Sequence, residues 1–315
     1  MRQPEKINPA GNGNVNPQKE SSFYRRLPQE IRNLVWVQLF SSTRIAVGFI
    51  EYPVSKFLDV TPAPNSLAAL RICRRARLEI GDSWLRHILF YFPGLHTMYK
   101  RLSVLPVETI TKLRHVRMSG EKFLFPCEGR NKTHCRYSIF DALRRLPGLQ
   151  LDQLTILGGS WSGCNYMDLL SLIELGDGWK TLRYLDRSSE LLGFRGKTRG
   201  WTPDGESRWQ PQPSGLKRIL EKRDGIASAP SVTIYRATES RFNGGMFDLA
   251  RRVKFEQHWD PQELVYYPQD DELMTKGEKE KEMLIIVNRG AGVDYVVKDI
   301  SARQLDDMGS LFPED

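Results

Sequence analysis

Residues 23–40 read Phe23-Tyr24-Arg25-Arg26-Leu27-Pro28-Gln29-Glu30-Ile31-Arg32-Asn33-Leu34-Val35-Trp36-Val37-Gln38-Leu39-Phe40. Apolar side chains recur in this stretch every three or four residues, at Leu27, Ile31, Leu34, Val35 and Leu39. Because that spacing matches the turn of an α-helix, the stretch predicts a helix with one apolar stripe. Such a stripe must face either the protein core or a partner.

Two residues specify the start of this helix. Pro28 suits the first helical position, because its ring fixes φ near the helical value and its missing N–H would have no partner there. Glu30 then falls in the first turn, where a carboxylate meets free amide donors and the positive end of the helix dipole. The sequence therefore predicts a helix that begins at about Pro28.

Three segments together resemble the fungal F-box-like domain family named for two Glu-x-Arg motifs, the double ExR domain. They are Leu27-Pro28-x-Glu30-Ile31-Arg32-x-x-x-Trp36, Arg44-Ile45-Ala46-Val47, and Leu70-x-x-Cys73-Arg74-x-Ala76-Arg77. The resemblance covers about residues 22–100. The second motif departs from the family, since it reads Arg75-Ala76-Arg77, and the insertion Ser41 to Pro64 separates the two helical halves more widely than in ordinary F-box domains.

The resemblance implies an interaction module and no enzyme activity. It implies that a Skp-type adaptor of a cullin-RING ubiquitin ligase would contact the stripe Leu27, Pro28, Ile31, Leu34 and Val35, while residues 101–300 would choose a protein substrate. The alternative for the stripe is that it packs on the predicted helix at 67–84 within the domain. The alternatives for function are a scaffold or regulatory protein without adaptor binding, and a basic protein that binds nucleic acid through Arg71, Arg74, Arg75 and Arg77.

The motif residues Glu30 and Arg32 lie about 200° apart around a helix, so they cannot pair with each other. Each should find a different partner on the second helix. We expect Glu30 to meet Arg74 or Arg77, and Arg32 to meet Glu79 or to stack on Trp36. Such a polar clasp between two helices would stabilise the fold.

Charge is unevenly distributed along the chain. Residues 1–100 carry 14 basic and 7 acidic groups, residues 101–200 carry 16 and 10, and the remainder carries 16 and 21. A basic first part makes nucleic acid one conceivable partner. No basic run is interleaved with aromatic residues as in a known binding module, so a solvated basic surface is the favoured interpretation.

Composition predicts an intracellular protein of the cytoplasm or nucleus that does not engage membranes. Residues 1–18 are polar and lack the apolar segment of a signal peptide, and no apolar run approaches the roughly 20 residues that span a bilayer. Four cysteines in 315 residues are too few for a disulfide framework.

The predicted fold class is α+β: an F-box-like helical module with a β-hairpin insertion, followed by an irregular β/α region of degenerate leucine-rich type. The predicted domains are a disordered leader (1–21), the F-box-like domain (22–100), the β/α region (101–300) and a frayed tail (301–315). A hairpin or a pair of edge strands is expected at 43–50 and 54–60. Beyond it, strands and helices should alternate, which favours parallel strands with helical crossovers. The expected strands are 113–118, 154–157, 182–185 and 232–235, the expected helices are 138–146, 166–175, 216–223 and 246–255, and a closing hairpin is expected at 283–288 and 295–297.

No catalytic, metal or cofactor site is predicted. Cys127 and Cys135 are eight residues apart, whereas structural zinc sites use close pairs. Neither serine of Gly158-Gly159-Ser160-Trp161-Ser162-Gly163 has the frame of a nucleophile elbow. Gly290-Ala291-Gly292 lacks the third glycine of a dinucleotide loop.

Overall fold

The computed structural model describes residues 20–47, 66–120, 123–126, 134–137, 139–158, 162–189, 214–239, 246, 248–255 and 280–295. Within it the chain forms two compact units. The helical unit comprises Met1–Thr43 and Pro62–Ile88, and the sheet unit comprises Arg44–Thr61 and Leu89–Asp315. The chain thus crosses between the units three times. The division differs from a boundary at residue 100, because the strands near residues 45 and 90 cluster with the sheet.

The helical unit is made of short helices. They are α1 (Ser22–Arg26), α2 (Gln29–Ser41), η2 (Ser66–Ala68), α3 (Ala69–Ile72), α4 (Arg74–Ile80) and η3 (Ser83–Arg86). The single helix predicted at 67–84 is therefore wrong: Cys73 adopts an extended backbone, φ −159° and ψ 160°, and separates α3 from α4. The thiol of Cys73 accepts a hydrogen bond from the Ala76 amide at 3.3 Å, so the break also caps α4.

Apolar side chains of α2, α4 and the segment after η3 form the core of the helical unit. Phe40 at the end of α2, Ala76 and Ile80 of α4, and Ile88 are all buried. The ring of Phe40 lies 6.4 Å from that of Trp84 in η3, at an interplanar angle of 45°. The last turn of α2 is thus anchored against η3.

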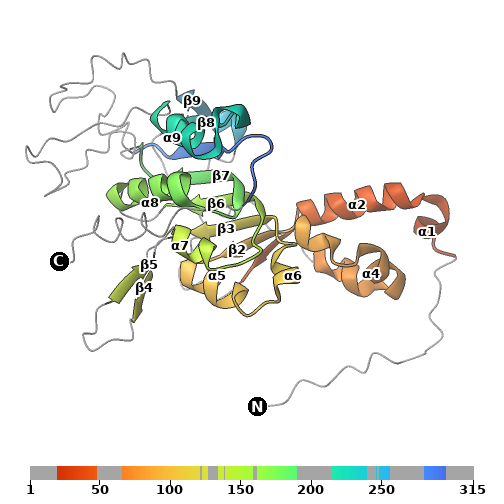
Figure 1. The fold of residues 1–315 in the computed structure, drawn as a ribbon. Coiled ribbons are helices and arrows are strands. Elements are labelled where there is room, and N and C mark those ends of the chain that lie inside the picture. The colour runs from red at the N-terminus through yellow and green to blue at the C-terminus, as the bar shows by residue number, and fades with distance from the viewer. Residues whose placement is uncertain are drawn as a thin grey trace, which may run out of the picture. The chain divides into compact units, whose positions relative to one another are not determined.

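The sheet unit contains one eight-stranded mixed sheet in the order β1-β2-β3-β6-β7-β10-β8-β9 (Figure 1). Its strands are β1 (Arg44–Ala46), β2 (Leu89–Phe92), β3 (His115–Ser119), β6 (Leu151–Leu157), β7 (Trp179–Asp186), β10 (Met283–Asn288), β8 (Ser231–Ala237) and β9 (Arg252–Phe255). The first five are parallel neighbours in chain order, and β10 pairs antiparallel with both β7 and β8. A separate two-stranded sheet joins β4 (Phe123–Pro126) to β5 (His134–Tyr137).

Helices cover one face of the eight-stranded sheet (Figure 1). They are α5 (Leu95–Leu102), α6 (Val107–Ile110), α7 (Ile139–Arg144), α8 (Ser162–Leu175) and α9 (Ser214–Asp224). The short turn η5 (Ile226–Ser228) follows α9, and another short turn, η7 (Leu249–Arg251), precedes β9. The strand residues that face this layer are apolar and buried, for example Val116, Leu154 and Leu182. Burial of this face is what a sheet with helical crossovers requires.

The mixed α/β composition predicted from the sequence is confirmed, and so are several elements. The four predicted strands correspond to β3, β6, β7 and β8, and three predicted helices correspond to α7, α8 and α9. These segments were recognisable because each is an apolar run of the length and period of its element.

The prediction for 43–50 and 54–60 is tested only in its first part: Arg44–Ala46 forms an edge strand that runs parallel to β2, and residues 54–60 fall outside the described residues. Two other predictions in this region are wrong. The predicted helix 246–255 is instead the turn η7 followed by the edge strand β9. Met283–Asn288 does not close a hairpin, because it inserts between β7 and β8. Partners distant in the chain decided these outcomes.

A buried cluster of charged residues ties the helices to the sheet. The guanidinium of Arg289 donates to the carboxylate of Asp224 at 2.9 and 2.7 Å, and to the Trp179 carbonyl at 3.2 Å. Arg223 lies 3.4 Å from the same carboxylate and donates to the Ile173 and Gly176 carbonyls at 2.6 and 2.7 Å. Arg223 thus satisfies carbonyls at the C-terminal end of α8, where a cation also suits the helix dipole.

No helix among the described residues is both long enough and apolar enough to cross a membrane.

Candidate functional site

The helix α2 has two different faces. Pro28 is its N-cap residue, one position earlier than predicted, and Glu30 lies in the first turn as predicted. Going around the helix, Arg32 and Phe40 are buried and Trp36 is half-buried, while Ile31, Leu34 and Val35 point away from the unit. The two faces follow from the sequence because positions 32, 36 and 40 recur every four residues.

The inward face carries the polar clasp. Arg32 donates from Nε and from a terminal nitrogen to the two carboxylate oxygens of Glu79 on α4, at 3.2 and 2.7 Å. Its other terminal nitrogen donates to the Leu27 carbonyl at 2.6 Å. Both partners are nearly buried, with 7% and 12% of their side chains exposed. This is the bidentate arrangement that makes arginine and carboxylate pairs strong, and the bond to Glu79 raises the pKa of Arg32.

One half of the predicted clasp is confirmed and the other half is wrong. Arg32 pairs with Glu79, which was one of its two predicted contacts. The central carbon of its guanidinium lies 5.3 Å from the centre of the Tyr24 ring, and not over Trp36. Glu30, Arg74 and Arg77 are exposed, and no ion pair joins them in the part of the chain that the structure describes. Arg32 is therefore the residue of the first Glu-x-Arg motif that stabilises the fold.

Tyr24 and Arg75 complete the clasp, and the sequence had not singled out Tyr24. The Arg75 guanidinium lies 4.3 Å from the centre of the Tyr24 ring and its Nε lies 3.7 Å from Glu79. The Tyr24 hydroxyl is 3.7 Å from the Cys73 thiol. Tyr24 of α1 thus connects with both residues that flank the start of α4.

Tyr24 should ionise later than an ordinary tyrosine. Burial, helped by the hydrogen bond to Cys73, raises the pKa of Tyr24 from 10.0 to about 12. The folded state favours the neutral phenol, so this contribution to stability is full below pH 10 and is lost as the pH rises toward 12. In a spectroscopic titration of tyrosinate, we expect Tyr24→Phe to remove one late-ionising group.

Tyr295 should also ionise late in this titration, because burial and its hydrogen bond to Asp152 raise its pKa to about 12 as well. Tyr24→Phe and Tyr295→Phe should therefore each lower the late absorbance by one tyrosine, and the double variant should lower it by two. Unchanged late absorbance in Tyr24→Phe would contradict the assignment.

The outward face of α2 is apolar and exposed. Ile31, Leu34 and Val35 expose 44%, 63% and 40% of their surfaces. These three residues are called the outer face below. Leu27 is half-buried and Pro28 is exposed at the start of the same stripe. The alternative that the stripe packs on the second helix is therefore wrong for the outer face.

The other candidate ligands and nucleophiles are not brought together. No group of three or more His, Cys, Asp or Glu side chains with metal-binding geometry occurs among the described residues. Cys127 and Ser160 lie outside these residues, and the side chains of Cys135 and Cys164 are not described.

No protein-family model matches the chain, and no curated protein or solved structure matches it either. The resemblance to the F-box-like family therefore rests on the three sequence segments between Leu27 and Arg77 that were described above. Function must therefore be argued from the geometry.

Proposed function

We propose that this chain is a noncatalytic protein-interaction protein of the cytoplasm or nucleus, an F-box-like substrate adaptor. In this proposal the helical unit docks a Skp-type adaptor of a cullin-RING ubiquitin ligase through the outer face of α2. The sheet unit chooses the protein substrate, and the transfer of ubiquitin belongs to other subunits.

The observation that carries the proposal is the exposure of three aliphatic side chains on one helical face. Contiguous exposed apolar surface is typical of protein interaction sites, and anchors at positions i, i+3 and i+4 of a helix are a common form. Ile31, Leu34 and Val35 have this spacing. Because about half of each side chain is already buried, burial of the remainder would contribute about 0.7–1.5 kcal/mol of binding free energy per residue.

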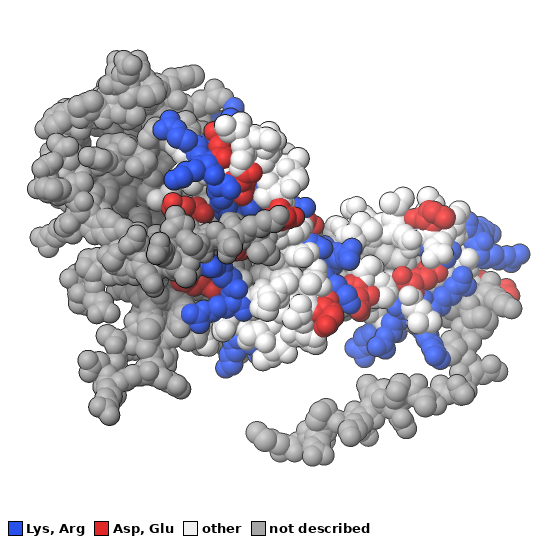
Figure 2. Space-filling view, in the orientation of Figure 1, with Lys and Arg blue, Asp and Glu red and all other residues white. Residues whose placement is uncertain are grey.

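The inner face of α2 supports the same proposal. The Arg32–Glu79 clasp and the contact of Phe40 with Trp84 use the opposite side of the helix, so docking on the outer face would not compete with the fold. The anchors are also presented on a rigid element, which lowers the entropic cost of binding. In Figure 2 the surface over α2 is mostly white, whereas blue side chains gather over α1 and α4.

The arrangement of the sheet unit is consistent with a degenerate leucine-rich-like arc. The strands β1, β2, β3, β6 and β7 are parallel and adjacent in chain order. A single layer of helices connects several of them, as in solenoid proteins that present the other face or edge of the sheet to partners. The irregular strand spacing and the antiparallel end of the sheet depart from a regular repeat.

The test is a pull-down of the full chain against a Skp-type adaptor. We expect the wild type to be retained and the variant Ile31→Asp, Leu34→Asp to lose binding, because charged groups replace the apolar anchors. Circular dichroism first checks that the variant is folded. The matched control is Leu78→Asp, since Leu78 on α4 exposes 73% of its surface outside the outer face and should bind as the wild type does.

Failure of the wild type to bind would reject the adaptor function and leave a scaffold of F-box-like sequence. Equal losses in the Leu78→Asp control would show that any added charge disrupts binding, which would reject the outer face as the docking site.

A further inference from the structure

The lysine and arginine positions of the helical unit are all arginines. Its described part, residues 20–43 and 66–88, contains eight arginines, four carboxylate side chains and no lysine. The sheet unit, in contrast, has exposed lysines, among them Lys100, Lys217 and Lys222. Arginine is enriched and lysine depleted at protein interfaces, because the planar guanidinium is weakly hydrated and forms paired hydrogen bonds to a carboxylate. The composition of the helical unit is thus typical of an interaction surface.

The helix α4 turns one face to solvent. Arg74, Arg77 and Leu78 lie at positions i, i+3 and i+4 of this helix, so they share a face. All three are exposed, and Leu78 exposes 73% of its surface. The opposite side carries Ala76 and Ile80, which are buried in the core of the unit. The outward face of α4 therefore presents two guanidinium groups beside an exposed leucine.

The helices α1 and α3 add further exposed arginines next to this face. The Tyr24 hydroxyl of α1 is 3.7 Å from the thiol of Cys73, the residue before α4, and the Arg75 guanidinium lies over the Tyr24 ring. The helix α1 thus packs at the start of α4, and blue side chains gather over both helices in Figure 2. The five exposed arginines and the leucine, called the arginine surface below, are Arg25, Arg26, Arg71, Arg74, Arg77 and Leu78.

The positive charges of the arginine surface are not matched by carboxylates of the described chain. Glu79, the carboxylate on α4, pairs with Arg32 and Arg75. None of the five arginines of the arginine surface makes an ion pair with a carboxylate among the described residues. Like charges on one exposed face repel each other at low salt, within the screening length of the solvent. A partner that supplies carboxylates would relieve this repulsion and gain charge-assisted hydrogen bonds.

The surroundings of the arginines favour a protein partner over a nucleic acid. A phosphate backbone offers nothing apolar to cover Leu78, whereas a peptide can supply both carboxylates and an apolar side chain. Proteins that bind single-stranded nucleic acid usually stack bases on exposed aromatic rings. No aromatic residue in the described part of the helical unit is exposed, and the ring of Tyr24 lies under the Arg75 guanidinium.

We propose that the arginine surface binds an acidic segment of a partner protein. Asp and Glu side chains of that segment pair with the guanidinium groups, and an apolar side chain of the segment covers Leu78. Recognition of acidic motifs by clustered arginines is a recurring mode of peptide binding. The outward face of α4 lies on the other side of the helix from Glu79, so the segment would leave the Arg32–Glu79 clasp intact. The inference does not depend on adaptor binding by the outer face of α2.

The experiment measures binding of a labelled synthetic peptide of four Glu-Glu-Leu repeats to the full chain by fluorescence anisotropy. We expect saturable binding that weakens several-fold when the salt concentration rises from about 50 to about 200 mM. The double variant Arg74→Gln, Arg77→Gln should weaken binding about ten-fold or more, because it removes two charge-assisted contacts. Leu78→Ser should weaken binding about three-fold, because it removes the apolar contact. Circular dichroism first checks that each variant is folded.

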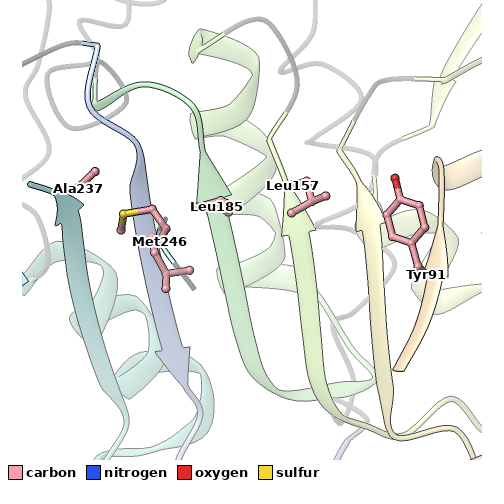
Figure 3. Close-up of a cluster of buried hydrophobic side chains, with 6 residues drawn as sticks. Tyr91, Leu157, Leu185, Ala237 and Met246 are labelled. Atoms are coloured by element: carbon pink, nitrogen blue, oxygen red, sulfur yellow. The ribbon is translucent and has the colours of Figure 1, made fainter. Parts of the chain in front are cut away.

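The matched control lies on α9 of the sheet unit, which has a buried apolar core of its own around Leu157 and Leu185 (Figure 3). The double variant Arg218→Gln, Lys222→Gln removes the same two charges from exposed positions of that helix. It should bind the peptide within about two-fold of the wild type, since isolated surface charges contribute little. A second peptide of Gln-Gln-Leu repeats should not bind, and one of Glu-Glu-Gln repeats should bind about three-fold more weakly.

Four results would overturn the proposal. They are no saturable binding of the Glu-Glu-Leu peptide, an equal loss in the α9 control, unchanged binding in Leu78→Ser, and tighter binding of single-stranded oligothymidylate than of the peptide. The last result would assign the arginine surface to nucleic acid instead. Peptide binding that persists in the variant Ile31→Asp, Leu34→Asp would support a surface separate from the outer face of α2, whether or not the adaptor binds.

Discussion

Replacing Asp224 with asparagine is expected to lower the free energy of unfolding of the sheet unit by about 3–5 kcal/mol. Asp224 and Arg289 expose only 3% and 2% of their side chains, and Arg223 is 3.4 Å from the same carboxylate. Asparagine keeps the shape but removes the charge, so the two buried guanidinium groups would lose their shared carboxylate, and only Arg223 would keep a second one nearby, that of Asp177. Both guanidinium groups also lie 5.7 Å from the Trp179 ring, so the disturbance reaches β7.

Urea unfolding followed by circular dichroism measures this loss, and hydrogen exchange of residues 283–288 locates it in β10. The control is Glu221→Gln on the same helix, because the Glu221 side chain makes a surface ion pair with Lys217, at 3.6 Å. That change should cost less than about 0.5 kcal/mol. Similar losses in the two variants would show that the buried cluster contributes no more than a surface pair.

Breaking the clasp of the helical unit should be nearly as costly. Arg32→Met keeps an unbranched side chain but removes the guanidinium, which leaves the Glu79 side chain 12% exposed with Arg75 nearby at 3.7 Å. We expect a loss of about 3 kcal/mol, at the lower end for a broken buried pair because Arg75 compensates in part. Hydrogen exchange of residues 29–41 in the full chain should rise accordingly.

Glu30→Gln is the matched control for the clasp, because it alters the other charged residue of the same motif at an exposed position. We expect its effect to stay within about 0.5 kcal/mol. A double-mutant cycle with Glu79→Gln then isolates the pair, and a coupling energy near zero would contradict a stabilising clasp.

The sequence predicted elements whose signals are local. The strands at 154–157 and 182–185 and the helix at 166–175 are apolar runs of suitable length, and they formed as β6, β7 and α8. Helix geometry also showed that Glu30 and Arg32 need separate partners, which led to Glu79. These inferences needed only the period of each element.

Features that depend on distant partners could not be predicted in the same way. Cys73 ends α3 without a glycine or proline as a signal. The bond between Asp224 and Arg289 joins residues 65 apart, and neither has a motif that points to the other. The sequence pattern of the apolar stripe on α2 is the same whether the stripe faces a core or solvent. Only the position of Glu79, which pairs with Arg32, shows which side of the helix faces the core.

The position of β10 has a consequence for the order of folding. This strand lies between β7 and β8, although it is synthesised after β8 and β9. Until residues 283–288 have left the ribosome, β7 and β8 cannot share their common neighbour, and each presents a row of unpaired backbone groups. The pairing of β10 with β7 closes a long loop, which slows completion of the sheet. Until then the nascent chain is prone to aggregation. A ribosome stalled before residue 283 would therefore hold two incomplete half-sheets, for which chaperones that shield exposed strand edges are the natural safeguard.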